Sequence, residues 1–443
     1  MRKVEEVLGS LKLDGGFVPV LEAGWRESAA TCPPGALPFA ERKFLEDHLA
    51  LAGIGEDVLP PLSRTAERIR NDEVLRLLAW HAHRTLCRGD ASLLVRWPEL
   101  DRVLGDDCGL FYLLIGLSCI PEFARTYRKL GIPEEYVAAS AKWLAGTVEI
   151  YRSAHGGLPG HTRSQLHWMR NYIDGRLFRI GRFEYMIQDW PASPAVFVYR
   201  NAVSGQVVAL AADGVACSAD GLVLYADQPR SEAAFVTTLI RDAEGAAGNP
   251  VSPEGFIFDR TVRLPSAEWT CVLTPGDFTP GVHIPGGGGM TPEACRESLK
   301  EAVRFFAAHF PQKPLRAFVC GSWIFSPDWE RLLPESNLAK LMRKCYLYPL
   351  RSSGRDGLFF LFGKEHGDLS EYPRDNSVRR AMLSVFDAGR RLRSGGMFFL
   401  PEELDRFDAD PYRTGWALPG SGAMESPAEA RPSGRKPGRR SDS

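Results

Sequence analysis

Four consecutive glycines, Gly286–Gly289, have the spacing most suggestive of a ligand site in this sequence. They follow a short apolar segment, residues 281–285, and precede Thr291-Pro292-Glu293, which is typical of the first turn of a helix. Glycines allow successive backbone N–H groups to turn in one direction, and a helix start adds unpaired N–H groups and partial positive charge. The pattern predicts a loop that binds a phosphate or pyrophosphate through main-chain amides, with a plain flexible loop as the alternative.

Two common nucleotide sites do not fit this loop. It lacks the Gly-Lys-Ser/Thr ending of a P-loop, and its glycines do not have the GxGxxG spacing of a dinucleotide site. We therefore expect an anion site that uses backbone groups alone.

Metal binding is not predicted. His81 and His83 are two residues apart on an expected helix, so they point to different faces. His155, His161 and His167 are spaced six apart around an expected loop, which is not a known ligand spacing. The nine cysteines form no CxxC pair, so a zinc ribbon is not expected.

The first 154 residues predict an all-α domain. Apolar residues recur at helical spacing over residues 40–51, 58–87, 109–130 and 133–154, and strand-like alternation is almost absent.

From residue 155 to 417 the pattern predicts a second domain of mixed type. Strands are expected over 177–187, 195–201, 207–211, 256–264, 268–273, 281–285, 315–325, 357–362 and 397–400, with a hairpin turn at 203–207. Helices are expected over 231–243, 291–309, 336–345 and 377–392. The fold class is thus α+β with an α/β-type core: a helical domain, then a mixed sheet flanked by helices. Residues 418–443 are rich in Ser, Pro, Gly, Arg and Glu and are expected to be a disordered tail.

Composition limits the possible partners. A formal net charge of −1 argues against nucleic-acid binding by bulk charge. The most apolar run, residues 108–121, is shorter than a bilayer span and is expected to be a buried helix, so no membrane partner is predicted. Nine irregularly spaced cysteines and a charged N-terminus favour a cytoplasmic protein with reduced thiols.

The segments that carry a resemblance to a known family are residues 178–185, 283–285 with the glycines, 290–295, 318–323, 336–337 and 395–401. In these segments the chain resembles a bacterial family with a helical N-acyltransferase N-terminal domain and a GNAT-like C-terminal domain. The resemblance covers nearly the whole chain except the tail. It implies transfer of an acyl group from acyl-coenzyme A to an amine of a small molecule or peptide, in a ternary complex and without a metal. The loop differs from the usual GNAT loop, because Ile284-Pro285 stands where an Arg or Gln normally precedes the glycines.

Within that interpretation the loop and the helix after it are expected to bind coenzyme A. The residues concerned are Ile284, Gly286, Gly287, Gly288, Gly289, Met290, Thr291 and Asn337. Asn337 is also expected to cap its own helix.

Four side chains are candidates for the chemistry. His283 is the first candidate for the general base because its ordinary pKa suits neutral pH, and Glu184 is the alternative, unless it only pairs with Arg179 or Arg182. Cys320 and Tyr346 are candidates for protonating the leaving thiolate, although both would also suit core packing.

Two other functions remain open from the sequence. The chain could be a non-catalytic GNAT-like binding or sensor module. A hydrolase with Cys320 or Ser322 as nucleophile is the weaker alternative, because no Gly-x-Ser-x-Gly motif is present.

Overall fold

The computed structural model describes residues 2–363 and 367–420, so most of the expected disordered tail, residues 421–443, lies outside the described residues. The chain divides into two compact units. The first comprises Met1–Met186, His283–Gly288 and Phe362–Lys364, and the second comprises Ile187–Val282, Gly289–Leu361 and Glu365–Ser443. The first unit therefore continues past residue 154, through a short helix and a hairpin.

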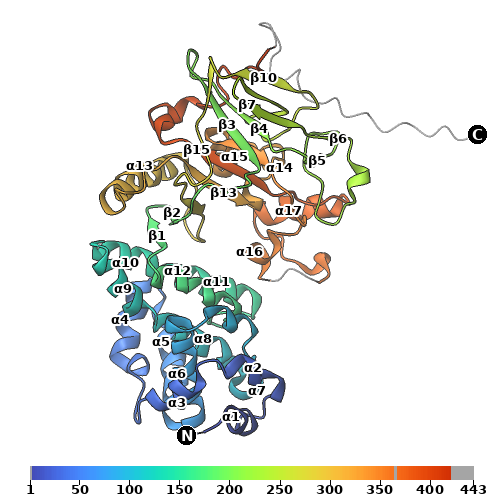
Figure 1. Ribbon diagram of the computed structural model, residues 1–443. Helices are drawn as coiled ribbons and strands as arrows, with labels where there is room; N and C mark the ends of the chain where they lie inside the picture. The colour runs from blue at the N-terminus through green and yellow to red at the C-terminus, as the bar shows by residue number, and fades with distance from the viewer. Residues whose placement is uncertain (1, 364–366, 421–443) are drawn as a thin grey trace, which may run out of the picture. The chain divides into compact units, whose positions relative to one another are not determined.

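The first unit is built from helices (Figure 1), as predicted. They are α1 (Val4–Ser10), α2 (Val18–Leu21), α3 (Trp25–Thr31), α4 (Arg42–Ala52), α5 (Leu59–Asn71), α6 (Glu73–Arg88), α7 (Asp101–Leu104), α8 (Cys108–Leu117), α9 (Ile120–Lys129), α10 (Glu134–Ala141), α11 (Trp143–Ala154) and α12 (Arg170–Ile173). The expected helix over 58–87 is divided at Asp72, whose side chain accepts hydrogen bonds from the N–H groups of Val74 and Leu75 and so starts α6.

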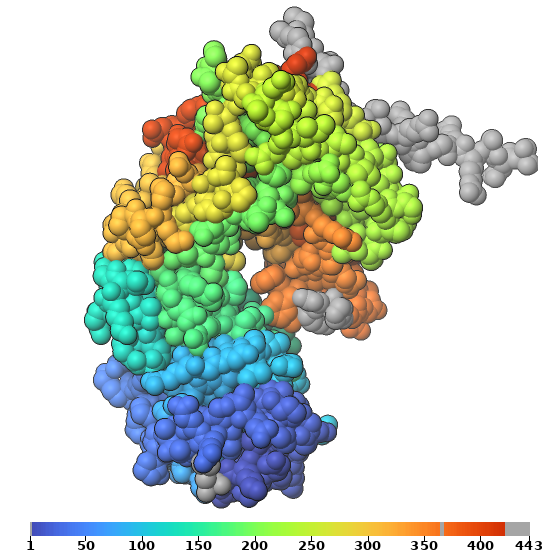
Figure 2. All heavy atoms as spheres, viewed as in Figure 1, coloured from blue at the N-terminus to red at the C-terminus, as the bar shows by residue number. Residues whose placement is uncertain are grey.

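The most apolar stretch lies in the interior of this unit. All residues of α8 after Cys108 are buried, as expected for a core helix. The helical stretch Asp101–Lys129 is long and apolar enough to cross a membrane by length and composition, yet 72% of its most apolar window is buried inside the structure. The first helices in the sequence, dark blue in Figure 2, form a continuous surface in this view.

The first unit ends in a two-stranded hairpin that is attached to the helices. Strands β1 (Leu177–Ile180) and β2 (Phe183–Met186) are antiparallel, and Gly181 turns between them with a φ of 58°. The Tyr127 hydroxyl donates to the Leu177 carbonyl at 2.7 Å, and the N–H of Arg179 donates to Ser140 Oγ at 3.2 Å. The helices therefore determine where the side chains of the hairpin lie.

The second unit contains the mixed sheet. Its strands lie in the order β12 (Gly281–His283), β13 (Phe318–Ser322), β15 (Gly395–Phe399) and β14 (Tyr346–Pro349). β12 is parallel to β13 but is paired with it only at Gly281↔Val319, whereas β15 is antiparallel to both of its neighbours. The helices of this part are α13 (Pro292–His309), α14 (Asp328–Leu332), α15 (Asn337–Lys344), α16 (Leu358–Phe362) and α17 (Ser377–Asp387). The order along the chain is β12, glycine loop, α13, β13, α14, α15, β14, α16, α17 and β15, and the last strand, β15, lies between β13 and β14 in the sheet.

A second group of sheets precedes β12 in the sequence. The strands are β3 (Val196–Asn201), β4 (Val207–Ala211), β5 (Ala216–Cys217), β6 (Phe235–Val236), β7 (Leu239–Asp242), β8 (Gly245–Gly248), β9 (Pro250–Val251), β10 (Val262–Pro265) and β11 (Trp269–Cys271). They form sheets in the orders β11-β3-β4-β9, β10-β8-β7 and β5-β6. The β3–β4 hairpin confirms the predicted turn at 203–207.

Two local predictions in the second unit were wrong. Residues 231–243 form β6 and β7 instead of a helix, and residues 357–362 contain α16 instead of a strand. Tyr346 follows the end of α15 as expected, but it begins a strand, β14, that was not predicted. The Thr237 hydroxyl donates to the carbonyl of Ala212, and the Arg379 guanidinium donates to the carbonyl of Leu361 at the end of α16. Short apolar runs do not distinguish a strand from a helix by themselves, so such distant contacts decide between them.

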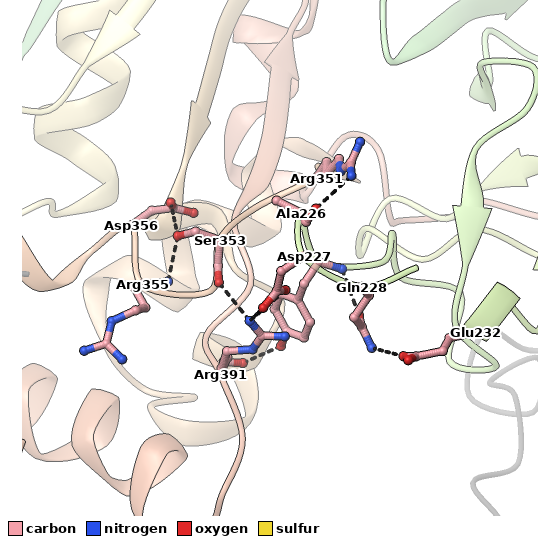
Figure 3. Close-up of polar contacts among 10 residues, drawn as sticks. Ala226, Asp227, Gln228, Glu232, Arg351, Ser353, Arg355, Asp356 and Arg391 are labelled. Carbon is pink, nitrogen blue, oxygen red and sulfur yellow. Dashed lines mark hydrogen bonds and ion pairs between the residues drawn. The ribbon is translucent and has the colours of Figure 1, made fainter. Parts of the chain in front are cut away.

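Arginines attach the long connection between β14 and β15 to residues 223–232 (Figure 3). Arg391 donates to both carboxylate oxygens of Asp227, at 2.9 and 2.8 Å, and its guanidinium lies 4.0 Å from the centre of the Tyr225 ring. Arg351 donates to the carbonyl of Ala226 at 2.9 Å. Because these cations already have partners within the protein, we assign them a structural role.

Candidate active site

The glycine loop presents main-chain amides at its surface. Gly286–Gly289 are exposed, and Gly287 and Gly288 have φ values of 75° and 69°, a conformation that favours glycine. Among the residues that the structure describes, the N–H groups of Gly286, Gly287 and Gly288 have no hydrogen-bond partner. The loop therefore keeps the donors that an anion requires.

The helix after the loop begins as predicted. Thr291 Oγ1 accepts a hydrogen bond from the N–H of Ala294 at 3.2 Å, and Pro292 is the first residue of α13. Pro292 has no N–H, and the N–H groups of Ala294 and Cys295 donate to the hydroxyl and the carbonyl of Thr291, so the amides of Gly286–Gly288 are the main donors left for an anion.

Arg182 supports the loop from the turn between β1 and β2. Its Nη1 donates to the carbonyl of Pro285 at 3.0 Å, and its Nη2 lies 3.5 Å from the carbonyl oxygen of Gly288. Because the C=O and N–H of one trans peptide point in opposite directions, the N–H of Gly286 faces away from the guanidinium that binds the Pro285 carbonyl, and Arg182 adds positive charge beside the loop. From the sequence, Arg182 was expected only as a possible ion-pair partner of Glu184. Nothing in the sequence indicates that the turn containing Arg182 contacts the glycine loop.

Asn337 lies beside the loop and does not cap its helix, so that prediction was wrong. The cap of α15 is Ser336, whose Oγ accepts from the N–H of Ala339 at 3.1 Å. The exposed amide of Asn337 is instead the side chain nearest to Gly289: a Cβ placed on this glycine would lie 3.7 Å from Asn337 Nδ2. The structure thus brings Asn337, Gly289 and Thr291 together.

Glu184 on β2 is a carboxyl group in an apolar setting. Its side chain is 1% exposed, and within the described part of the chain its Oε1 has no hydrogen-bond partner. Burial raises the pKa of Glu184 to about 7, an effect opposed by the Tyr172 hydroxyl and by the charges of Arg179 and Arg182. A carboxyl group with this pKa can both accept and release a proton near neutral pH.

His283, at the end of β12, is in a different state. Burial lowers its pKa to about 4, so the imidazole is neutral at pH 7. Its ring meets the ring of Trp168 edge to face, with centroids 4.9 Å apart. A neutral imidazole with so low a pKa is a weak base, but its N–H can still donate a hydrogen bond. The electrostatics therefore favour Glu184 over His283 as the base and reverse the order of preference drawn from the sequence.

Cys320 lies on β13, opposite Met397 of β15. Burial raises the pKa of the Cys320 thiol to about 12, well above that of an ordinary thiol, roughly 8.5. Such a thiol is fully protonated at neutral pH, which disfavours a nucleophile. Proton transfer from it to a leaving thiolate is also uphill, so Cys320 has no evident role as the acid.

Tyr346 is part of the core of the second unit. Its hydroxyl donates to the carbonyl of Val251 at 2.6 Å and accepts from the N–H of Ala209 at 3.1 Å. Burial raises its pKa well above the ordinary value. Both hydrogen bonds hold β14 against β4 and β9, and we therefore assign Tyr346 a structural role.

Ile284 and Met290 flank the glycines and are both partly buried. Among the described residues, no group of three or more His, Cys, Asp or Glu side chains is placed to hold a metal ion.

Comparison with known proteins agrees with this architecture. Residues 43–175 match the family described as N-acyltransferase N-terminal domain, and residues 177–399 match the family described as GNAT-like C-terminal domain. No curated protein shows significant similarity to the chain.

Two solved structures share the fold. One is an acyltransferase mutant in complex with octanoyl-CoA, with 21% sequence identity, and another is an acyltransferase in complex with decanoyl-CoA and teicoplanin, with 20% identity. Both have a TM-score of 0.60, and both alignments cover 90% of this chain and 99% of the other. The two matched regions are separated by one residue and together span most of the chain. The protein therefore belongs to the acyltransferase family in which an N-acyltransferase N-terminal domain precedes a GNAT-like C-terminal domain.

Proposed function

We propose that this protein is an N-acyltransferase that moves an acyl group from acyl-coenzyme A to the amine of a small-molecule acceptor. The observation that carries the proposal is the exposed glycine loop, whose unpaired amides precede the capped start of α13. A diphosphate fits such donors. The acyltransferases of the same fold were solved with acyl-CoA or CoA. One of these complexes also contains teicoplanin and a further one contains 10C-teicoplanin, which supports acyl-CoA as the donor and a small molecule as the acceptor. The irregular cysteine spacing supports a cytoplasmic location.

Binding of the donor begins at the loop. The amides of Gly286–Gly288 hold the diphosphate, and Arg182 keeps the loop in the receptive conformation through the carbonyls of Pro285 and Gly288. The exposed amide of Asn337 is available to hydrogen-bond the pantetheine arm. Holding donor and acceptor together supplies a large part of the rate.

Glu184 removes the proton of the acceptor. The ammonium group gives one proton to the Glu184 carboxylate, directly or through a bound water, and the neutral amine attacks the thioester carbonyl carbon. The N–H of neutral His283 donates to the carbonyl oxygen as charge develops there. The C–N bond forms, the C–S bond breaks, and the second proton of the attacking nitrogen leaves with the thiolate. The products are an amide and the free thiol of coenzyme A.

Donor binding is tested by thermal unfolding with octanoyl-CoA and with pantetheine as a control that lacks the diphosphate. A ligand at 100 times its Kd stabilises the native state by about 2.7 kcal/mol. We expect a rise in Tm of several degrees with octanoyl-CoA and little change with pantetheine. No shift at millimolar octanoyl-CoA would contradict the proposal. If octanoyl-CoA raises Tm but no thiol is released with any of the primary amines tested, a sensor module would be favoured.

The contribution of Arg182 is tested by Arg182→Ala. We expect the Kd of octanoyl-CoA to rise about tenfold, because the loop loses the hydrogen bonds of a charged donor. Arg176→Ala is the matched control, since Arg176 lies in the same hairpin region and its side chain contacts only Asn171 and Asp174 in the described structure. Equal affinity in both variants, measured by isothermal titration calorimetry, would remove Arg182 from the donor site.

A further inference from the structure

Two thiols meet in the core of the helical unit, away from the glycine loop. Cys87 is the penultimate residue of α6, and Cys119 lies between α8 and α9. Their sulfur atoms are 3.5 Å apart, and neither cysteine is in a disulfide. Both side chains are buried, with 6% exposure for Cys87 and none for Cys119.

A histidine and a serine complete the cluster. His83, one turn before Cys87 on α6, has its Nδ1 3.6 Å from Cys87 Sγ and 2.8 Å from Ser118 Oγ. Ser118 donates its own hydroxyl proton to the carbonyl of Ile115 at 2.6 Å, so its oxygen is left to accept a hydrogen bond from His83. His83 Nδ1 thus donates to Ser118 and is also the ring nitrogen that faces Cys87.

The two sulfur atoms are not equivalent in this setting. The contacts of Cys87 Sγ with the Cys119 thiol at 3.5 Å and with His83 Nδ1 at 3.6 Å lower the pKa of the Cys87 thiol, despite burial and the charge of Glu122. Burial raises the pKa of Cys119, whose sulfur also lies 3.4 Å from the carbonyl of Ile115. Cys87 is therefore the thiolate-forming partner, and Cys119 the thiol beside it.

We propose that Cys87 and Cys119 form an oxidation site at which a peroxide converts the pair into a disulfide that links α6 to the α8–α9 junction. The Cys87 thiolate attacks one peroxide oxygen, the O–O bond breaks, and the leaving hydroxide becomes water with the proton that Cys87 had given up. Cys119 then attacks the sulfur of the resulting sulfenic acid, the S–O bond breaks, and the hydroxyl leaves as a second water with the proton of Cys119. Two thiols and one peroxide thus give one disulfide and two waters.

The geometry supports both steps. The sulfur atoms need to approach from 3.5 Å to about 2.05 Å, a movement within reach of side-chain rotation. Cys87 retains 6% exposure at the end of α6 and is followed by the exposed residues Arg88, Gly89 and Asp90, so we expect peroxide to enter from this end. The site is independent of acyl transfer, so its test does not depend on the proposed function.

The experiment treats the full-length protein with hydrogen peroxide and maps the products by mass spectrometry. We expect the intact mass to fall by two hydrogen atoms, and digestion to yield a peptide pair linked through Cys87 and Cys119. In Cys119→Ala the reaction should stop at the sulfenic acid, so dimedone should label Cys87. Cys217→Ala, which removes a buried cysteine of the other unit, is the matched control and should form the disulfide as the wild type does.

Three outcomes would overturn the proposal. They are oxidation of other cysteines while Cys87 and Cys119 remain reduced, over-oxidation of wild-type Cys87 without a cross-link, and dimedone labelling of Cys119→Ala at a position other than Cys87. Since the cross-link is mapped in the wild-type protein, the result does not depend on folding of the variants.

Discussion

Glu184→Gln is expected to lower kcat for acyl transfer by about 10²–10⁴-fold, the usual contribution of a general base. The amide has nearly the shape of the carboxyl group but cannot accept a proton at neutral pH. In the wild type, kcat/KM should rise with pH through the range around 7, because Glu184 must be ionised to act and its pKa is about 7. In the variant this rise should disappear, while the Kd of octanoyl-CoA should change little, since the loop amides and Arg182 are retained.

The measurement is release of the coenzyme A thiol over a range of pH with a primary amine acceptor. Glu135→Gln is the control, because Glu135 is exposed on α10 in the same unit. A variant with wild-type kcat and an unchanged pH profile would exclude Glu184 as the base. The base assignment would then return to His283.

The same substitution is expected to make the protein more stable at alkaline pH. In the unfolded chain Glu184 has an ordinary pKa, near 4.5, whereas in the folded protein burial raises its pKa to about 7. Below pH 4.5 the Glu184 carboxyl group is protonated in both states and does not lower the free energy of unfolding. Between pH 4.5 and 7, Glu184 ionises in the unfolded chain but not yet in the folded protein. The free energy of unfolding therefore decreases as pH rises over this range, and the decrease is complete above the folded pKa.

A difference of about 2.5 pKa units corresponds to roughly 3 kcal/mol. Gln does not ionise, so the free energy of unfolding of Glu184→Gln should rise relative to that of the wild type by about 2–3 kcal/mol between pH 5 and pH 8. Urea unfolding of both proteins at the two pH values measures this change. A difference between the two proteins that does not vary with pH would show that Glu184 is not held in a desolvated site.

Together these two results would identify a residue retained for activity at the expense of stability. Unpaired buried carboxyl groups are costly in a protein interior, so a variant that gains stability while losing turnover cannot owe the loss to misfolding. The helices position this group: Tyr172 of α12 and Tyr127 of α9 both lie in the electrostatic environment of Glu184. The helical unit therefore contributes to the chemistry that we propose.

Local interactions made several parts of the structure predictable from the sequence. Helical periodicity indicated the first domain, and the start of α13 followed from Thr291 and Pro292, because a cap is made by atoms within three residues of one another. The turn at Gly205 and the exposed glycine loop are local in the same sense.

Two elements that were missed or assigned wrongly depend on distant partners. β14 is a strand because residues 346–349 pair with β15, whose residues follow after a long connection. Residues 357–362 contain α16, and the guanidinium of Arg379 binds its last turn. The prediction that Asn337 caps its helix was wrong for a local reason, because the adjacent Ser336 is the cap. That the Asn337 side chain lies near Gly289 is visible only in the tertiary structure.

The sequence alone determined the family, the helical and mixed-sheet halves, and a backbone site suited to a diphosphate, because these depend on torsion angles and hydrogen bonds between near neighbours. Only the tertiary structure shows that burial raises the pKa of Glu184 and lowers that of His283, that Arg182 binds the carbonyl of Pro285, and that burial raises the pKa values of Cys320 and Tyr346. Desolvation shifts a pKa through whatever packs against the group, and those neighbours come from elements far apart in the chain.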